Sequence, residues 1–439
     1  MKSLLKKIIP SFLILFYHQC LARAAAFFYG HPSNKLIVVG VTGTNGKSTV
    51  VNLTAKILEG SGSKVGLTST YNFKVGDTEW LNDKKMTMLG RFALQKFLRR
   101  LVKEGCRYAV IETSSEGIKQ SRHLGINYDV AVFTNLTPEH LESHGSFENY
   151  KSAKGKLFVR LSQGKRKEID GKIINKISVV NLDDPSADFF LSFPADDKFG
   201  FSLKKGKQYQ GIKIFCPGKY SVDKNGGRYL IQDQEIKSKL LGEFNIYNSL
   251  AALAVGFSQN IPLEKIKTAL EKIKSLPGRL EFINEGQAFK IIVDYAPEPG
   301  SMKKLYEVVN LLEKKRIIHV LGSCGGGRDK ARRPILGEMA AAKADIVIVT
   351  NEDPYDEDPQ AIIDQVAAGA ANKGKIKDKD LFTILDRRQA IEMAIKVAQP
   401  GDLVLFTGKG AEQAICGKNG QKIPWDERKA VREILAKMR

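Results

Sequence analysis

Gly43-Thr44-Asn45-Gly46-Lys47-Ser48-Thr49 follows an apolar run, residues 36–41, and precedes a stretch with helical spacing of apolar residues, 50–58. A strand that enters a glycine-containing loop and then a helix can bind phosphate, because the backbone N–H groups and the positive end of the helix face the anion. Lys47 can reach phosphate oxygens, and the hydroxyl of Ser48 or Thr49 can hold Mg²⁺. The loop predicts nucleotide binding, with a chance glycine turn as the alternative.

The order of strand, loop and helix is repeated after this loop. Residues 108–112, 130–134 and 177–181 have the composition of buried strands, and residues 91–103 and 147–161 have helical spacing. Alternation of this kind predicts an α/β domain with a mostly parallel sheet that is covered by helices on both faces.

A second α/β domain is expected after residues 276–279, which have the composition of a linker. Before it, residues 204–239 are rich in glycine and lysine with short alternations, and are expected to form β-hairpins. We expect a P-loop central domain over residues 36–275 and a Rossmann-like domain over 276–439. Strands of the second domain are expected at 290–294, 317–322, 345–350 and 402–407.

The first 35 residues form an apolar segment, expected to be a short helix. Lysines at positions 2, 6 and 7 precede it, and His18, Gln19 and Arg23 interrupt it. It falls short of the roughly 20 uninterrupted apolar residues of a membrane-spanning helix. A peripheral contact of residues 1–30 with the anionic inner face of the membrane is one interpretation. A helix packed on the protein itself or on a partner is another, and a true span or signal is the third.

The composition is that of an ordinary globular protein with a large positive charge. The 439 residues carry a net charge of +21, and 43% are hydrophobic. An anionic ligand or simply a lysine-rich solvated surface would account for the charge. No basic block with interleaved aromatics is present, which argues against nucleic acid. The five cysteines are scattered without a Cys-x-x-Cys pair, which argues against zinc and disulfides and favours the cytoplasm. The sequence gives no basis for assigning an oligomeric state.

Polar groups follow the strands expected around the phosphate loop. Glu112 ends one strand, His140 follows the next, and Asn181 and Asp184 follow the third. Ligands of parallel sheets gather at the carboxyl ends of the strands. Because Mg²⁺ takes one or two protein groups with phosphate oxygens and water, Glu112 and His140 are candidate metal ligands. An acid near a helix start and a structural histidine are the alternatives.

The order and spacing of ten motifs resemble those of the Mur ligases, most closely the UDP-N-acetylmuramoyl-tripeptide synthetases. The resemblance covers about residues 36–439. The motifs are at 43–49, 112–115, 134–140, 144–146, 150–158, 242–248, 277–279, 294–296, 325–330 and 408–410.

This resemblance implies an ATP-dependent amide ligase. ATP would phosphorylate a carboxylate of the acceptor, and the amine of an amino acid would then displace the phosphate. By resemblance, the catalytic groups are Lys47, Glu112, His140 and Lys154. Ser48 and Glu112 would hold one Mg²⁺, and His140 and Lys154 a second. The family's matching lysine is carbamylated by CO₂, whereas from this sequence alone Lys154 would be a surface lysine.

Further ligand-binding residues follow from the same resemblance. Those expected to bind the nucleotide are Gly43, Thr44, Asn45, Gly46, Lys47, Ser48, Thr49, Asn181, Asp184, Asn245, Asn248, Arg279 and Asp294. Those expected to bind the amino acid or the acceptor are Ser114, Ser115, Gln120, Arg122, Arg328, Asp353, Tyr355, Asp356, Lys409 and Glu412. Helix capping is the alternative for Asn245 and Asn248, and an exposed arginine for Arg122.

Three departures from the family bear on the substrate. The nucleotide-sugar-binding domain that precedes the loop in full-length members is replaced by the apolar segment, so a lipid-linked acceptor or a partner's pocket becomes conceivable. Tyr355 stands in place of an arginine that reads a distal carboxylate, and acids surround it, which favours a basic amino acid such as lysine or ornithine. Glu116, Pro297 and Ala411 stand where the family commonly has histidine.

The leading hypothesis is therefore a ligase that extends a muramoyl-dipeptide-like acceptor in peptidoglycan precursor synthesis. A polyglutamate-type or other amino-acid-polymer ligase is the alternative within the superfamily. A membrane-associated nucleotide-binding subunit that needs a partner, and a P-loop switch or transport ATPase, are alternatives of other classes.

Overall fold

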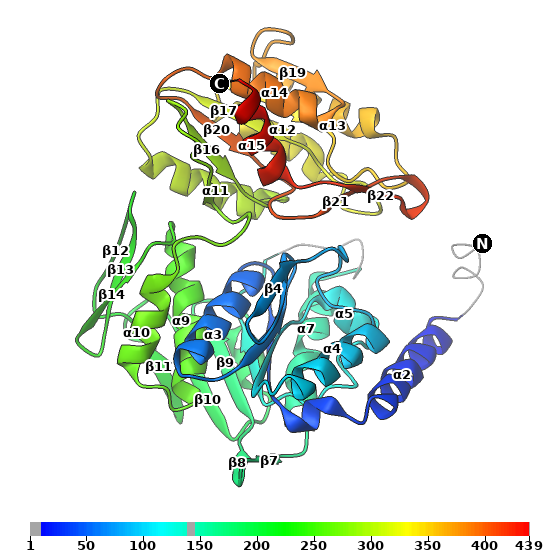
Figure 1. The fold of residues 1–439 in the computed structure, drawn as a ribbon, viewed down its shortest axis with the longest axis vertical. Coiled ribbons are helices and arrows are strands. Elements are labelled where there is room, and N and C mark those ends of the chain that lie inside the picture. The colour runs from blue at the N-terminus through cyan, green and yellow to red at the C-terminus, as the bar shows by residue number, and fades with distance from the viewer. Residues whose placement is uncertain (1–9, 138–144, 439) are drawn as a thin grey trace.

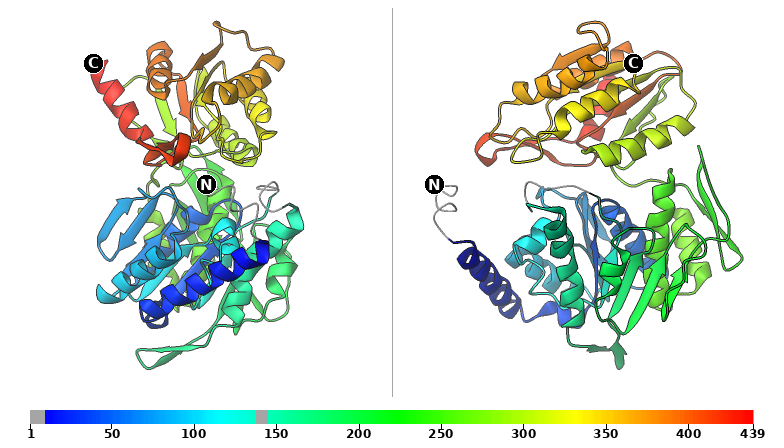
Figure 2. Two further views of the ribbon diagram at one scale, coloured as in Figure 1. Left: turned by 90° about the vertical axis from the view of Figure 1, so that its right-hand side faces the viewer. Right: turned by 180° about the vertical axis from the view of Figure 1, so that it is seen from behind.

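The chain folds into two α/β units stacked one above the other, with a helix from the N-terminal segment on the outside of the lower unit (Figures 1 and 2). The computed structural model describes residues 10–137 and 145–438. The prediction of a mostly parallel central sheet followed by a second α/β domain is confirmed.

The central domain is built on a nine-stranded sheet of order β11-β10-β9-β6-β1-β5-β2-β3-β4. Its strands are parallel except for the antiparallel edge formed by β3 and β4. β1, which leads into the phosphate loop, lies between β5 and β6. The strands are β1 (Ile37–Thr42), β2 (Val65–Thr68), β3 (Asn72–Val75), β4 (Thr78–Leu81), β5 (Tyr108–Glu112), β6 (Val130–Phe133), β9 (Ile177–Asn181), β10 (Asp197–Phe201) and β11 (Ile212–Phe215).

Helices cover both faces of this sheet, because β1 turns apolar side chains to each side in alternation. Ile37, Val39 and Val41 join the core under α3, α9 and α10. Leu36 and Val38 join the core under α4, α5, α7 and α8. The helices are α3 (Lys47–Gly60), α4 (Arg91–Lys103), α5 (Ser115–Lys119), α7 (Phe147–Ser162), α8 (Ala187–Leu191), α9 (Glu243–Ser258) and α10 (Leu263–Lys272).

Two small sheets extend the central domain. One is the hairpin β7 (Lys167–Ile169) with β8 (Lys172–Ile174), and the other contains β12 (Tyr220–Asp223), β13 (Gly226–Ile231) and β14 (Gln234–Ser238). The Lys167 side chain of β7 pairs with buried Asp129, whose carboxylate also accepts hydrogen bonds from the Val38 N–H at 2.8 Å and the Lys176 ammonium at 3.0 Å.

The C-terminal domain has a six-stranded sheet of order β15-β16-β20-β17-β18-β19, parallel except for β15. α11, α12 and α13 pack on one face, and α14 and α15 on the other. The elements are β15 (Glu281–Phe282), β16 (Lys290–Val293), α11 (Pro299–Leu311), β17 (Ile317–Leu321), α12 (Arg332–Ala341), β18 (Ile346–Thr350), α13 (Pro359–Asn372), β19 (Leu381–Ile384), α14 (Arg387–Val397), β20 (Leu403–Phe406), β21 (Ala414–Cys416), β22 (Lys422–Pro424) and α15 (Glu427–Lys437).

The N-terminal segment forms α2 (Ser11–Phe28). Its C-terminal half buries three alanines, at positions 22, 25 and 26, whereas large apolar side chains are exposed along its N-terminal half and at its last two residues, Phe27 and Phe28. It is followed by the 3₁₀ turn η1 (Pro32–Lys35), which leads into β1. Within the described residues, no helix has the length and apolar character that crossing a membrane requires.

Candidate active site

The phosphate loop adopts a backbone that only glycine fits at two positions. Gly43 and Gly46 have φ angles of +148° and +83°. A Cβ atom on Gly43 would lie 2.0 Å from Oγ1 of Thr134, and one on Gly46 would lie 2.3 Å from Oδ1 of Asn248. Both glycines are therefore needed for the backbone conformation and for the close approach of neighbouring residues.

The strand-end segment after β6 fixes the shape of the loop. The N–H of Thr44 donates to the Asn135 carbonyl at 2.8 Å, and the N–H of Asn45 donates to Oδ1 of Asn135 at 2.9 Å. Oγ1 of Thr134 donates to the carbonyl of Asn45 at 2.7 Å. The loop is thus held open as a preformed anion cradle at the N-terminus of α3.

Two lysines donate to carbonyl groups of the loop. Nζ of Lys47, at the start of α3, donates to the Thr44 carbonyl at 2.6 Å. Nζ of Lys154, on α7, donates to the Gly43 carbonyl at 2.7 Å and lies 4.2 Å from the ring centroid of Tyr150. The sequence alone favoured a surface position for Lys154, but its side chain is buried beside the phosphate loop.

Glu112, at the end of β5, accepts three hydrogen bonds at the edge of the loop. Ser48 Oγ donates to Oε2 at 2.7 Å, Thr70 N–H donates to Oε2 at 2.7 Å, and Thr70 Oγ1 donates to Oε1 at 2.9 Å. The carboxylate and the Ser48 hydroxyl are hard oxygen donors beside a phosphate cradle, which fits Mg²⁺ with phosphate oxygens and water completing its shell. Among the described residues, no group of three or more His, Cys, Asp or Glu side chains is placed to hold a metal ion. His140, the predicted second-metal ligand, lies outside the described residues.

Two cavities meet at the phosphate loop. The first, of about 290 Å³, is polar and contains Lys47, Ser48 and Glu112. The second, of about 420 Å³, is lined by the apolar side chains of Phe201, Phe244 and Leu305 together with asparagines. Residues of both the central and the C-terminal domain line each cavity. Asn45, Gly46, Thr49, Arg279 and Pro297 line both of them.

Most of the predicted site residues line one of these cavities. The predicted residues in the polar cavity are Thr44, Asn45, Gly46, Lys47, Ser48, Thr49, Glu112, Ser114, Ser115, Arg122, Lys154, Arg279 and Arg328. In the apolar cavity, the predicted residues include Asn181, Asn245, Asn248 and Asp294. The Asp294 carboxylate accepts from the N–H groups of Leu280 at 2.7 Å and Ala296 at 2.9 Å, and burial raises its pKa. It thereby fixes the segment that carries Arg279.

Some predicted residues lie beside the two cavities rather than on their walls, where the walls are those formed by the described residues. Gly43 contributes its carbonyl to Lys154. Asp184 accepts from the N–H groups of Leu136 at 2.6 Å and Ser186 at 2.8 Å, so it shapes the loop after β6. Gln120 accepts at 2.7 Å from the Arg122 guanidinium, and so orients that side chain.

The acids of the loop after β18 were expected to be free to attract an amine substrate, but in the structure they already have partners. Asp353 is buried and accepts from Lys409 at 2.8 Å and Lys85 at 2.8 Å. Glu412 pairs with the same two lysines. The remaining acids of the loop also have partners: Glu352 accepts from the Cys324 thiol, Asp356 from the Asn419 N–H, and Glu357 from Arg333. Tyr355, with φ of +53°, donates its N–H to the Cys416 carbonyl.

Sequence reasoning missed several groups of the site. Thr70 supplies two of the three donors to Glu112. Glu298, at the start of α11, accepts from Nδ2 of Asn45 at 3.0 Å and so contacts the phosphate loop from the C-terminal domain. Lys85 lies in the connection between β4 and α4 and also lines the polar cavity. None of these residues stands in a recognisable motif, and each partner is distant in sequence.

Comparisons with known proteins agree with this geometry. Residues 41–256 match the Mur ligase middle domain, and residues 278–410 match the Mur ligase, glutamate ligase domain. The chain is 38% identical over 438 residues to a UDP-N-acetylmuramyl-tripeptide synthetase of Roseiflexus sp., covering 98% of this chain and 84% of that protein. It is 36% identical over 421 residues to a UDP-N-acetylmuramoyl-L-alanyl-D-glutamate–2,6-diaminopimelate ligase of Syntrophomonas wolfei, covering 95% and 82%. A solved structure of a ligase with that latter name superposes with a TM-score of 0.58 at 28% identity, over 92% of this chain and 79% of that one.

Proposed function

Because the chain belongs to the Mur ligase family of ATP-dependent amide ligases, which add amino acids in peptidoglycan precursor synthesis, we propose that its two cavities divide the substrates of this reaction. The apolar cavity takes the adenosine of ATP between Phe244, Leu305 and the asparagines of α9. The triphosphate crosses the phosphate loop into the polar cavity, where the acceptor carboxylate and the amine meet. The observation that carries this proposal is the set of residues shared by both cavities at the loop.

The residues of the polar cavity have distinct roles in this proposal. The acceptor carboxylate attacks the γ-phosphorus, ADP leaves, and the amine then displaces phosphate from the acyl phosphate to form the amide. Lys47 and the loop N–H groups offset the negative charge that gathers at the phosphoryl group. Arg279, which lies 4.6 Å from the ring centroid of Tyr295, approaches the phosphates from the C-terminal domain. Ser114, Ser115, Arg122 and Arg328 face the acceptor or the amino acid.

Magnesium is proposed at Ser48 and Glu112, where it would neutralise phosphate charge and orient the transferring group. By resemblance, a second ion would use His140 and a carbamylated Lys154. The position of the Lys154 Nζ beside the loop supports this assignment, because a carbamate there would turn a cation into an oxygen ligand. Lys154→Ala should lose turnover, with partial rescue by short-chain carboxylic acids. Unchanged turnover would reject the assignment.

The acceptor is proposed to be a muramoyl-dipeptide-like molecule, and the amine a basic amino acid such as lysine or ornithine. Because the acids near Tyr355 already have partners, the preference rests on Tyr355 standing where the family has an arginine. Tyr355→Arg should then shift preference from lysine toward diaminopimelate. A wild-type preference for diaminopimelate in direct competition would reject the proposal. A polyglutamate-type ligase remains the second candidate.

The test of the main proposal is ADP release by the purified protein with Mg²⁺. Amino acids are screened against UDP-linked and lipid-linked muramoyl-dipeptide acceptors and against a polyglutamate acceptor, and the amide product is identified by mass spectrometry. Release that depends on both a muramoyl acceptor and an amino acid is expected. Turnover with the polyglutamate acceptor alone would favour the second candidate, and no turnover with any pair would contradict both.

A peripheral contact of α2 with an anionic membrane surface on the cytoplasmic side is also proposed. Phe12, Phe16, Phe27 and Phe28 are each more than 60% exposed, and the helix contains no acidic residue. Aromatic side chains and basic flanks suit the interface of anionic lipid. Co-sedimentation with vesicles of anionic lipid is expected, and should be lost in a Phe12→Ser/Phe16→Ser variant. Equal binding to zwitterionic vesicles, or none, would contradict it.

A further inference from the structure

Lys85 joins the two domains through a buried ion pair. Its Nζ donates to Oδ2 of Asp353 at 2.8 Å and also to the carboxylate of Glu412. Lys85 belongs to the central domain, whereas both acids belong to the C-terminal domain, 268 and 327 positions further along the chain. The side chains of Lys85 and Asp353 are each only 5% exposed, so solvent screens this contact weakly.

The charges around Lys85 balance only when the two domains are together. Within the C-terminal domain, Lys409 donates to Oδ1 of Asp353 at 2.8 Å and lies 3.1 Å from the Glu412 carboxylate. The Cys416 N–H donates to the same Asp353 oxygen at 2.7 Å. Among the described residues, the two carboxylates thus share one ammonium within the C-terminal domain, and Lys85 supplies the second. A buried charge without a partner is costly, so the arrangement without Lys85 is disfavoured.

The pKa shifts agree with this charge balance. Burial opposes the charge on Lys85, but the carboxylates of Glu412 and Asp353 outweigh it and raise the pKa of Lys85. Burial likewise opposes the charge on Asp353, but Lys409 and Lys85 outweigh it and lower its pKa. Lys85 and Asp353 are therefore both charged over the physiological pH range.

The segment that carries Lys85 also reaches the candidate metal site. Oγ1 of Thr87 lies 3.1 Å from Oγ1 of Thr70, which donates to Glu112 at 2.9 Å. Arg122 donates to the Met88 carbonyl on the same segment. A hydrogen-bonded chain therefore runs from Glu112 to a residue two positions from Lys85.

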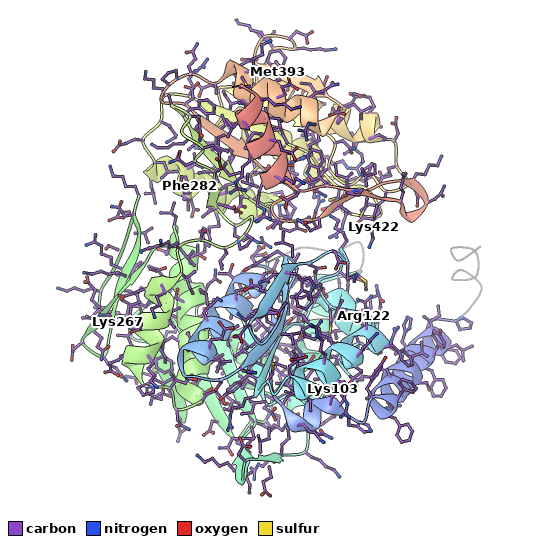
Figure 3. The ribbon with its side chains drawn as sticks, viewed as in Figure 1. Lys103, Arg122, Lys267, Phe282, Met393 and Lys422 are labelled. Carbon is purple, nitrogen blue, oxygen red and sulfur yellow. The ribbon has the colours of Figure 1, made fainter. Side chains whose placement is uncertain are left out.

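A second contact supports the same junction from the C-terminal domain. Nζ of Lys422, on β22, donates to the Lys84 carbonyl at 2.9 Å. Figure 3 shows Lys422 on the underside of the C-terminal domain and Arg122 on the facing side of the central domain. The segment 84–88 is thus held between the metal-site carboxylate and the C-terminal domain.

We propose that Lys85 is a positioning residue that fastens the C-terminal domain over the phosphate loop by completing the four-charge cluster with Asp353, Lys409 and Glu412. It acts through the closed arrangement of the domains and not on the reacting atoms. The kinetic part of the proposal rests on the proposed ligase function, whereas the structural part does not.

The experiment compares Lys85→Met with Lys84→Met. The Lys84 side chain is 58% exposed and, among the residues that the structure describes, forms an ion pair with exposed Asp83 alone, so its variant controls for loss of a lysine from the same segment. Fluorophores on the outer surfaces of the two domains report the closed fraction by energy transfer, with Mg²⁺ and a non-hydrolysable ATP analogue present. Thermal unfolding of each variant shows that it folds.

Lys85→Met should lower the closed fraction and reduce kcat/KM for the amino acid by about 10- to 100-fold, since a buried pair is broken. Lys85→Arg should recover part of the loss. Glu412→Gln should also reduce closure, and the double variant should lose less than the product of the two single losses. Lys84→Met should behave as wild type.

A closed fraction and kcat/KM within twofold of wild type in Lys85→Met would overturn the proposal, as would multiplicative losses in the double variant. If wild type shows no ligase turnover at all, the proposed function fails, but the energy-transfer measurement still decides whether Lys85 fastens the domains. The two failures are therefore distinguishable.

Discussion

Replacing Glu112 by glutamine removes one negative charge at the edge of the phosphate loop while keeping the size of the side chain. In the structure, three donors point at this carboxylate, one from Ser48 and two from Thr70. Glutamine keeps one acceptor oxygen and replaces the other with an NH₂ group, which cannot accept. At least one of the three donors therefore loses the carboxylate oxygen to which it donates.

The size of the effect follows from these contacts. A hydrogen bond to a charged group contributes about 1.5–3 kcal/mol, and the neutral amide weakens the bonds that remain. Loss of the charge should also weaken Mg²⁺ binding at the proposed Ser48–Glu112 site. We expect about 3 kcal/mol less stabilisation of the phosphoryl-transfer step, which is roughly a 10²-fold loss in rate at 1.36 kcal/mol per tenfold.

The assay is ADP release as a function of Mg²⁺ concentration, for wild type, Glu112→Gln and Glu116→Gln. Glu116 lines the same polar cavity but is not a proposed metal ligand, so it is the matched control. Glu112→Gln should lower the maximal rate and move the Mg²⁺ midpoint to higher concentration. The reasoning is refuted if its rate stays within threefold of wild type with an unchanged midpoint, or if Glu116→Gln shows the same shift.

Three further predictions concern the loop, the core and pH. Gly46→Ala should abolish binding of a fluorescent ATP analogue, because the added methyl group cannot fit and the φ angle is left-handed; binding within twofold of wild type would contradict this. Asp129→Asn should lower the free energy of unfolding by about 3–5 kcal/mol, since two buried ammonium groups lose their counter-charge, as read from urea unfolding. Asp170→Asn, at an exposed pair, should change it by less than about 1 kcal/mol. Burial lowers the pKa of His123 and His319 to about 3, so below the ordinary value of about 6.5 the unfolded chain binds protons that the folded chain cannot. Each of these two histidines should lower the free energy of unfolding by about 2 kcal/mol between pH 7 and pH 5. Replacing His319 with Asn should therefore flatten the dependence of that free energy on pH in this range.

The parts of the fold set by local periodicity could be predicted from the sequence. The amphipathic spacing of α4 and the continuous apolar runs of β5 and β9 placed these elements at the residues where the structure has them. The hairpins expected in residues 204–239 occur in β12, β13 and β14. β11 instead pairs in parallel with β10, because its partner is set by the edge of the large sheet and not by a neighbouring turn.

The residues of the candidate site could be predicted where polar side chains follow the end of a strand. They could not be predicted where they depend on contacts between the two domains. Glu112 and Asn181 end buried strands beside the phosphate loop, where parallel sheets gather their ligands, and each lines one of the two cavities. The pairing of Lys85 with Asp353 spans 268 positions, and the spacing of the sequence carries no signal for it. The same holds for the acids around Tyr355, whose charges appeared free because their partners lie on distant elements. The roles of His140 and Lys154 and the division at residues 35 and 275 stay predictions.

The phosphate loop lies between the apolar cavity and the polar one, and this arrangement bears on the design of chemical probes. A compound that fills only the apolar cavity, the proposed adenosine site, would also bind other proteins whose adenine sites have a similar lining. A rod-shaped molecule with an aromatic head and an anionic tail could span both cavities past Asn45 and Arg279, because more basic than acidic side chains line the polar cavity. Its selectivity would come from its length, because it has to reach from the apolar cavity past the phosphate loop into the polar one.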